Sequence, residues 1–196
     1  IGGSPVFSFA VYQDEMNSEK VVAHLYQGGL GLPDRDYYFN KDERTDKIRG
    51  EYRQHLSRMF MLMGDKPEQA NIHSYVTMRL ETAFAENSRK LEDLRDPYAN
   101  YHKSTVAKMS ADAPAFNCRR MLDQMGLSKV DSVIVGQPEF FRFVEKSLKT
   151  VSIDDWKTYL RWHLLRSSAP YLHAAVENAH FAFYGTVLSG QPEPEP

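Results

Sequence analysis

The chain has 196 residues, of which 42% are hydrophobic and 26% are charged, and this composition is typical of an ordinary globular protein of about one domain. The formal net charge is −2, and lysine and arginine are spread along the chain, which argues against a nucleic-acid partner. No apolar run approaches the ~20 residues that a membrane-spanning helix needs, so we expect no membrane contact by this segment. Cys118 is the one cysteine, which excludes an internal disulfide and a cysteine-based zinc site and predicts a small buried side chain.

The two ends of the sequence differ from its middle. The chain begins at Ile1 without an initiating Met, and it finishes in the Pro/Glu-rich segment 191–196, which is typical of a linker or a cut end. We therefore expect one largely helical domain over residues 1–190, as a fragment of a larger protein.

The first elements in chain order are two short β-rich runs. Phe7, Phe9 and Val11 alternate with smaller or more polar neighbours, which predicts a half-buried strand. A second β-rich run covers residues 20–27, and the polar segment 14–19 between the runs supplies a turn. This arrangement predicts a β-hairpin near the N-terminus.

Helical patterns follow. Apolar side chains at steps of three and four predict a helix over residues 46–63, which Gly64 ends. A second helix is expected to begin at Pro67 and to run to about Leu94, because Pro97 disfavours helix in the residue before it. We expect this second helix to bury Ala70, Tyr75, Val76, Leu80, Ala83, Phe84 and Leu91.

The next segments are shorter. Ser104 is a candidate N-cap for a short helix, and another helix is expected over residues 114–125. The β-prone run 132–135 predicts a strand, and Pro138 predicts the start of a further helix.

Two final helices complete a mainly α, multi-helix domain with a small β-hairpin near the N-terminus. Ser152 and Asp155 resemble a capping box at the start of the first of these helices. The last helix is expected over residues 169–184. The inward face of the helix that follows Ser152 is expected to carry Ile153, Trp156, Tyr159, Leu160 and Leu164.

The sequence contains no H-E-x-x-H, no G-x-S-x-G and no phosphate-binding P-loop motif. The best group for metal chemistry is His173, Glu177 and His180, because positions i, i+4 and i+7 of a helix share one face and these side chains are metal ligands. Structural packing is the favoured interpretation of this group, since such a face commonly covers core aromatics or forms a local ion pair.

The remaining candidates also have structural explanations. Asp154 and Asp155 stand at a helix start, where carboxylates favour the positive end of the helix dipole, rather than in an acid–base pair. The aromatic clusters 139–143 and 156–162 are interpreted as core faces, with a peptide-binding groove as the alternative. Five scattered histidines are interpreted as surface or core residues: His24, His55, His73, His102 and His163.

The segment GLGLPDRDYY, from Gly29 to Tyr38, is the most specific motif. Its glycines permit unusual backbone angles, Asp34 can close a turn through its own side chain, and Arg35 can hold a carboxylate or carbonyls. The segment is therefore interpreted as a bend held by a polar network and not as a catalytic loop, with direct ligand contact left open. Its structural residues are Gly29, Gly31, Pro33, Arg35, Asp36, Tyr37 and Tyr38.

This motif and four later segments, in the same order, resemble the neprilysin and endothelin-converting-enzyme family of zinc metallopeptidases. The resemblance extends over nearly the whole chain. The four later segments are LRDPYANYHK (94–103), VIVGQPEFF (133–141), DDWKTYLRWHLL (154–165) and FAFYGTVLSG (181–190).

The resemblance implies the family's largely helical, lid-like second domain, which faces the catalytic domain of the same polypeptide across a cavity that admits peptide substrates. The family's H-E-x-x-H motif, its downstream glutamate ligand and its N-A-Y segment have no counterpart here, so no catalytic or zinc-binding residue is carried over. Zinc is expected in the catalytic half, and this chain is expected to be inactive alone. The single cysteine is typical of a bacterial member, which implies a periplasmic or extracellular parent, with a membrane anchor left open.

Two other functions are open alternatives. The chain could be a free-standing enzyme that uses His173, Glu177 and His180, or a free-standing helical module that binds peptides or a partner protein. The first alternative predicts chelator-sensitive turnover, and the second predicts binding without turnover.

Overall fold

The computed structural model describes residues 5–193, and their contacts divide the chain into two compact units. The sheet unit contains residues 5–30 and 84–151, and the helical unit contains residues 31–83 and 152–193. Each unit is thus built from two separate stretches of the chain.

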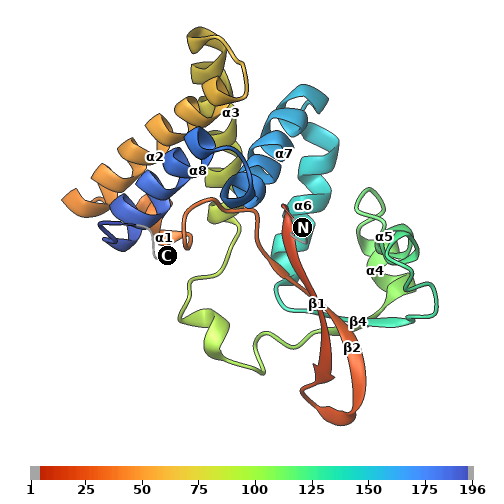
Figure 1. Cartoon of the computed structure of the whole chain (residues 1–196). Coiled ribbons are helices and arrows are strands. Elements are labelled where there is room, and N and C mark those ends of the chain that lie inside the picture. Colours follow the sequence, from red (N-terminus) through yellow and green to blue (C-terminus); the bar gives the residue numbers. More distant parts are fainter. Residues whose placement is uncertain (1–4, 194–196) are drawn as a thin grey trace. The chain divides into compact units, whose positions relative to one another are not determined.

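The fold is mainly α with a small sheet, as the sequence predicts (Figure 1). The elements of the sheet unit are β1 (Phe7–Asp14), β2 (Asn17–Gln27), a 3₁₀ turn η1 (Asp93–Arg95), β3 (Lys103–Thr105), α4 (Val106–Asp112), α5 (Cys118–Gln124), β4 (Ser132–Val135) and α6 (Pro138–Thr150). Those of the helical unit are α1 (Asp36–Phe39), α2 (Glu43–Leu62), α3 (Pro67–Glu86, whose last turn belongs to the sheet unit), α7 (Ile153–Ser168), the 3₁₀ turn η2 (Ala169–Tyr171), α8 (Ala174–Phe181) and the π-helical turn η3 (Ala182–Leu188).

The sheet has the strand order β1-β2-β4-β3. β1 and β2 form the predicted antiparallel hairpin, in which Phe9 pairs with Leu25 (Figure 1). β4 lies parallel to β2, with Ile134 opposite His24, and antiparallel to β3. The hairpin is therefore half of a four-stranded sheet.

β3 corrects the prediction that Ser104 caps a helix. Ser104 pairs with Val133 in the sheet, and the cap is the next residue, Thr105, whose hydroxyl accepts a hydrogen bond of 3.1 Å from the Lys108 amide. The following helix is also shorter than predicted, because α5 begins at Cys118. Cys118 is buried as expected, and burial raises the pKa of its thiol to about 11.

α3 ends eight residues before the predicted end at Leu94. Beyond Glu86, the Arg89 amide donates a hydrogen bond of 2.7 Å to the side chain of Gln27 on β2. The Gln27 amide group in turn donates to the Arg89 carbonyl at 3.0 Å. These hydrogen bonds between distant parts of the chain take the place of helical hydrogen bonds after Glu86. No local sequence pattern predicts them.

The helical unit has α2 packed against α7 and α8 (Figure 1). The predicted N-cap of α7 is present, because the Ser152 hydroxyl accepts from the Asp155 amide at 3.1 Å. The Asp155 carboxylate binds Arg79 at 2.6 Å. The largest fully buried side chains of this unit are Tyr52, Leu56, Met59, Phe60, Tyr159 and Trp162.

Several apolar residues that we expected inside are exposed. Tyr75 on α3 is 69% exposed, whereas Thr77 and Glu81 on the same helix are fully buried. On α7 the buried face runs through Tyr159 and Trp162 instead of through Leu160. The inward predictions that are wrong are Tyr75, Leu91, Ile153, Leu160 and Leu164.

Candidate functional site

The segment Gly29–Tyr38 forms the bend that its composition predicts. Gly29 has a φ of +80°, which is the left-handed region that favours glycine. Asp34 closes a turn, because its Oδ1 accepts a hydrogen bond of 2.8 Å from the Asp36 amide at the start of α1. Pro33, between the glycines and this turn, is exposed.

The hydroxyl of Tyr38 holds the bend from inside the helical unit. It accepts hydrogen bonds from the amides of Gly31, at 3.2 Å, and Leu32, at 3.1 Å. It donates its own proton to Glu81 Oε2 at 2.9 Å. A single phenol thus satisfies two backbone donors of the bend and connects them to α3.

Glu81 is the centre of this network and is fully buried. Besides Tyr38, its carboxylate accepts from the Tyr52 hydroxyl, at 2.9 Å, and from Trp162 Nε1, at 3.1 Å. His163 Nε2 lies 3.2 Å from Oε1 without hydrogen-bond geometry. We call Tyr38, Tyr52, Glu81 and Trp162 the Glu81 network, and its members come from α1, α2, α3 and α7.

The electrostatics of the network keep the phenols protonated. Burial, followed by the nearby Glu81 carboxylate, raises the pKa of both Tyr38 and Tyr52 well above the ordinary value. Burial works against the charge of Arg166, but neighbouring phenols and Glu81 raise the pKa of its guanidinium overall. The buried carboxylate therefore has three fixed donors and a permanent cation nearby.

Gly31 is required by close packing. A Cβ built at this position would overlap the Tyr52 hydroxyl and would lie 2.8 Å from Glu81 Oε1. The Gly31 carbonyl accepts a hydrogen bond of 3.0 Å from the hydroxyl of Tyr184 on η3. The backbone of the bend consequently passes directly against the network, with no room for a side chain.

The other residues of the motif stabilise the bend from its outer side. Arg35 Nη1 lies 3.5 Å from Asp36 Oδ1, and its guanidinium carbon lies 5.3 Å from the centre of the Phe39 ring. The Tyr37 carbonyl accepts from Arg49 Nη1 on α2 at 2.9 Å. The Arg35 contacts thus lie within the bend and α1, and the Arg49 hydrogen bond joins α1 to α2.

The metal-ligand candidates do not share a helix face. The predicted helix 169–184 is broken, so that His173 precedes α8 with an extended backbone. His180 lies against the Tyr184 ring, with the ring centres 4.6 Å apart, and Glu177 is exposed. Within residues 5–193 there is no group of three or more His, Cys, Asp and Glu side chains arranged to hold a metal ion.

Three of the other histidines occupy packed positions. His55 is buried and stacks on Phe183 with ring centres 5.0 Å apart, and burial lowers the pKa of its imidazole to about 3. His73 pairs with Asp65 at 2.6 Å. His24 is buried on β2, and burial lowers its pKa.

Glu81 is the residue of this network that the sequence patterns did not reveal. The buried residues of α3 recur at steps of three and four and include Thr77, Glu81 and Phe84. A carboxylate in this inward stripe was the available signal, because a buried charge requires hydrogen-bonding partners. The tyrosines and the tryptophan that supply them are far away in sequence.

Comparison with known proteins identifies the family. The N-terminal model of peptidase family M13 matches residues 1–196. This chain belongs to peptidase family M13. Within residues 5–193, no helix is both long enough and apolar enough to cross a bilayer.

Relatives of this M13 chain include endothelin-converting enzyme 1 of Cavia porcellus, which is 31% identical over 192 residues, covering 93% of this chain and 25% of the relative. Neprilysin-3 of Drosophila melanogaster is 28% identical over 186 residues, covering 89% of this chain and 24% of the relative. The chain thus spans about a quarter of the length of these curated relatives.

Two solved structures resemble this chain in fold. Zinc metalloprotease Zmp1 of Mycobacterium tuberculosis, in its open state, matches with a TM-score of 0.92 and 27% identity, covering 99% of this chain and 30% of Zmp1. PepO of Lactobacillus rhamnosis matches with a TM-score of 0.79 at 18% identity, covering 98% of this chain and 30% of PepO, which shows a shared fold. The M13 family assignment therefore rests on both sequence and structure.

Proposed function

We propose that this chain is the non-catalytic helical domain of a neprilysin-like zinc metalloendopeptidase, where it encloses the active-site cavity and restricts substrates to peptides. The observation that carries the proposal is that the N-terminal model of the family matches the whole chain. The relatives that the chain matches are about four times as long. The sequence itself contains no H-E-x-x-H motif.

The proposal places zinc in the rest of the polypeptide. A catalytic zinc needs three protein ligands and an open position for water. The described residues of this chain offer no such group. Its contribution would be steric, since a packed helical wall excludes folded proteins from a cavity that admits flexible peptides.

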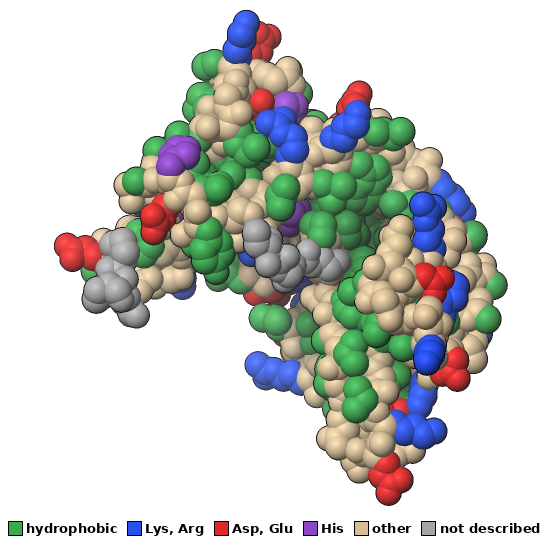
Figure 2. Space-filling model, turned by 45° about the vertical axis from the view of Figure 1, so that its right-hand side comes forward, with side chains coloured by type: hydrophobic (Ala, Val, Ile, Leu, Met, Phe, Trp, Pro, Cys, Tyr) green, Lys and Arg blue, Asp and Glu red, His purple; other side chains and the backbone are tan. Residues whose placement is uncertain are grey.

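A surface for the catalytic domain is available on the helical unit. Along α7, Ile153 is 73% exposed and Leu164 is 61% exposed, and their spacing of eleven residues puts them on one helix face. Leu160 lies on the same face and is 41% exposed. Figure 2 shows that hydrophobic side chains reach the surface in several patches. Such faces mark sites of protein contact, and we assign this one to the catalytic domain.

The test compares the 196-residue chain with the native polypeptide. We would isolate the native protein with an antibody to this chain, sequence it beyond Pro196, and assay both proteins on a short peptide and on a stably folded protein. The proposal expects an H-E-x-x-H segment, zinc-dependent cleavage of the peptide alone by the native protein, and no turnover by the isolated chain. A native protein that ends near Pro196 would refute it and favour a free-standing binding module.

The parent is further proposed to be a bacterial, periplasmic or extracellular enzyme. The single cysteine supports a bacterial origin. Fractionation of the source cells tests the compartment, because a cytoplasmic location would contradict it.

A further inference from the structure

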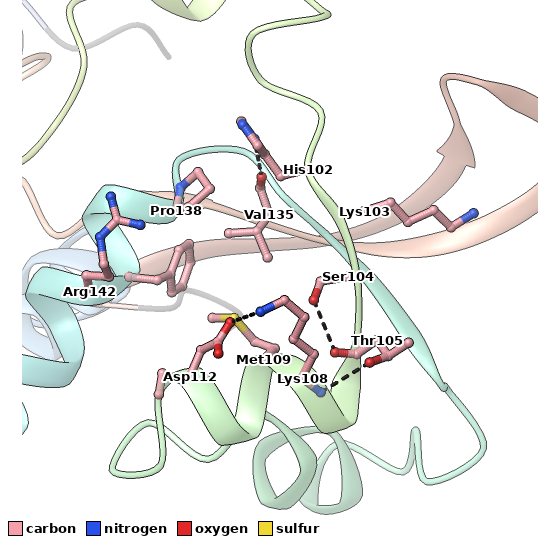
Figure 3. Close-up of a pocket in the computed structure, with 12 residues that line it drawn as sticks. His102, Lys103, Ser104, Thr105, Lys108, Met109, Asp112, Val135, Pro138 and Arg142 are labelled. Atoms are coloured by element: carbon pink, nitrogen blue, oxygen red, sulfur yellow. Dashed lines mark hydrogen bonds and ion pairs between the residues drawn. The ribbon is translucent and has the colours of Figure 1, made fainter.

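The sheet unit contains a cavity of about 680 Å³ that the proposed function does not use. β3 and α4 line one side of it, and the end of β4 and the first turns of α6 line the other (Figure 3). This volume is typical of sites that enclose a small ligand.

The floor of the cavity is apolar. Met109 on α4, Ala113 directly after α4, Val135 on β4 and Phe141 on α6 are all buried and line it, together with Pro138. Apolar side chains in a preformed cavity favour a ligand with an aromatic or branched aliphatic group.

The charged side chains at the rim differ in whether they already have partners. Lys108 Nζ lies 2.7 Å from Asp112 Oδ2 within α4 (Figure 3). Lys103 Nζ lies 2.6 Å from Asp14 Oδ2 on β1. Among the described residues, Arg142 has no hydrogen bond or ion pair, and its charge interacts at longer range with Glu139 on the same helix. Arg142 is exposed and stands on α6 beside Pro138 (Figure 3). The rim therefore presents one guanidinium whose N–H groups are available to a ligand.

We propose that this cavity binds an apolar carboxylate, that is, a ligand with an aromatic or branched aliphatic group next to a carboxylate. The apolar group would lie on the floor formed by Met109, Val135 and Phe141. The carboxylate would accept hydrogen bonds from the planar fork of Arg142, which matches carboxylate geometry. The carboxyl end of a peptide and a small free acid share this chemistry.

The test is an NMR titration of the isotope-labelled 196-residue chain with N-acetyl-L-phenylalanine, which carries both groups, and with N-acetyl-L-phenylalaninamide, which lacks the charge. We expect shifts of the amide signals around the cavity and about fivefold weaker binding of the amide, the ratio that an exposed ion pair gives. Equal affinities of acid and amide, or shifts outside the cavity, would overturn the proposal.

Substitutions sharpen the test. Arg142→Met should abolish the difference between acid and amide, whereas Arg120→Met, at an exposed position of the same unit outside the cavity, should preserve it. Ser104→Phe fills the cavity from β3 and should reduce the affinity of both compounds. An equal effect of the two arginine variants would refute the role of Arg142.

A third probe distinguishes the sources of the ligand. 3-Phenylpropionate has the ring and the carboxylate but no amide group. If it binds as well as N-acetyl-L-phenylalanine, the cavity is a site for small apolar acids. If it binds more weakly, the amide group contributes and the site is one for peptide ends.

Discussion

Replacement of Tyr38 by Phe tests whether the Glu81 network stabilises the bend. The substitution keeps the ring and removes only the hydroxyl, so it leaves no large cavity. The buried amides of Gly31 and Leu32 lose their acceptor, and Glu81 loses one of its donors. Each unsatisfied buried N–H costs ~1–3 kcal/mol, so we expect the free energy of unfolding to fall by about 3–4 kcal/mol.

The assay is urea denaturation followed by tryptophan fluorescence, which reports on Trp156 and on Trp162, the buried member of the network. We also expect the melting temperature to fall by about 10 °C, since ~1 kcal/mol corresponds to ~2–4 °C in a protein of this size. The matched control is Tyr75→Phe on α3, where the ring is 69% exposed, and its effect should stay within ~0.5 kcal/mol. Equal stabilities of the two variants would show that the bend does not depend on the phenol.

Four further predictions, the first with its own control variant, test the remaining contacts. Gly31→Ala should cost about 2–3 kcal/mol through overpacking, whereas Gly50→Ala, where a Cβ meets nothing within 4 Å, should be neutral or stabilising in a melting experiment. Arg35→Ala should cost ~1 kcal/mol without changing peptide affinity in the native polypeptide, and lost affinity at full stability would favour a ligand contact instead. The hydrogen bond from the Lys103 ammonium lowers the pKa of Asp14 to about 2. The stabilisation that the Asp14 carboxylate gives the fold is therefore present above ~pH 4 and is lost as the pH falls toward 2, so Asp14→Asn should flatten this part of a stability–pH curve. Burial lowers the pKa of His55 to about 3, so stability should fall as the pH drops from ~6.5 toward 3, and a His55→Phe variant that retained this slope would contradict the assignment.

The sequence was sufficient where local chemistry decides structure. Ser152 as a helix cap, Pro138 at the first residue of α6 and the strand 132–135 are all confirmed. For the two helix starts the determining residue lies at the start itself, so a short window contains the information. For the strand the β-prone composition was sufficient, although its partners on β2 and β3 are distant in sequence.

The sequence was insufficient where distant contacts decide it. The end of α3 depends on hydrogen bonds between Arg89 and Gln27, which are 62 residues apart. Glu81 can be buried because Tyr38, Tyr52 and Trp162 donate hydrogen bonds to its carboxylate. A single sequence does not reveal hydrogen bonds between residues so far apart. The family resemblance drew attention to the motif at Gly29–Tyr38, but it did not point to Glu81, whose carboxylate accepts the hydrogen bond of Tyr38.

The division of each unit between two stretches of chain has a consequence for synthesis on the ribosome. Tyr38, Tyr52 and Glu81 emerge long before Trp162, and the segment that completes the sheet unit is translated between them. Glu81 must therefore remain hydrated, or only partly paired, until α7 leaves the exit tunnel. Domains tend to fold as units during synthesis, so the sheet unit can be complete first and the helical unit closes last. During synthesis, the full burial of this carboxylate therefore waits for a donor that arrives with the C-terminal quarter of the chain.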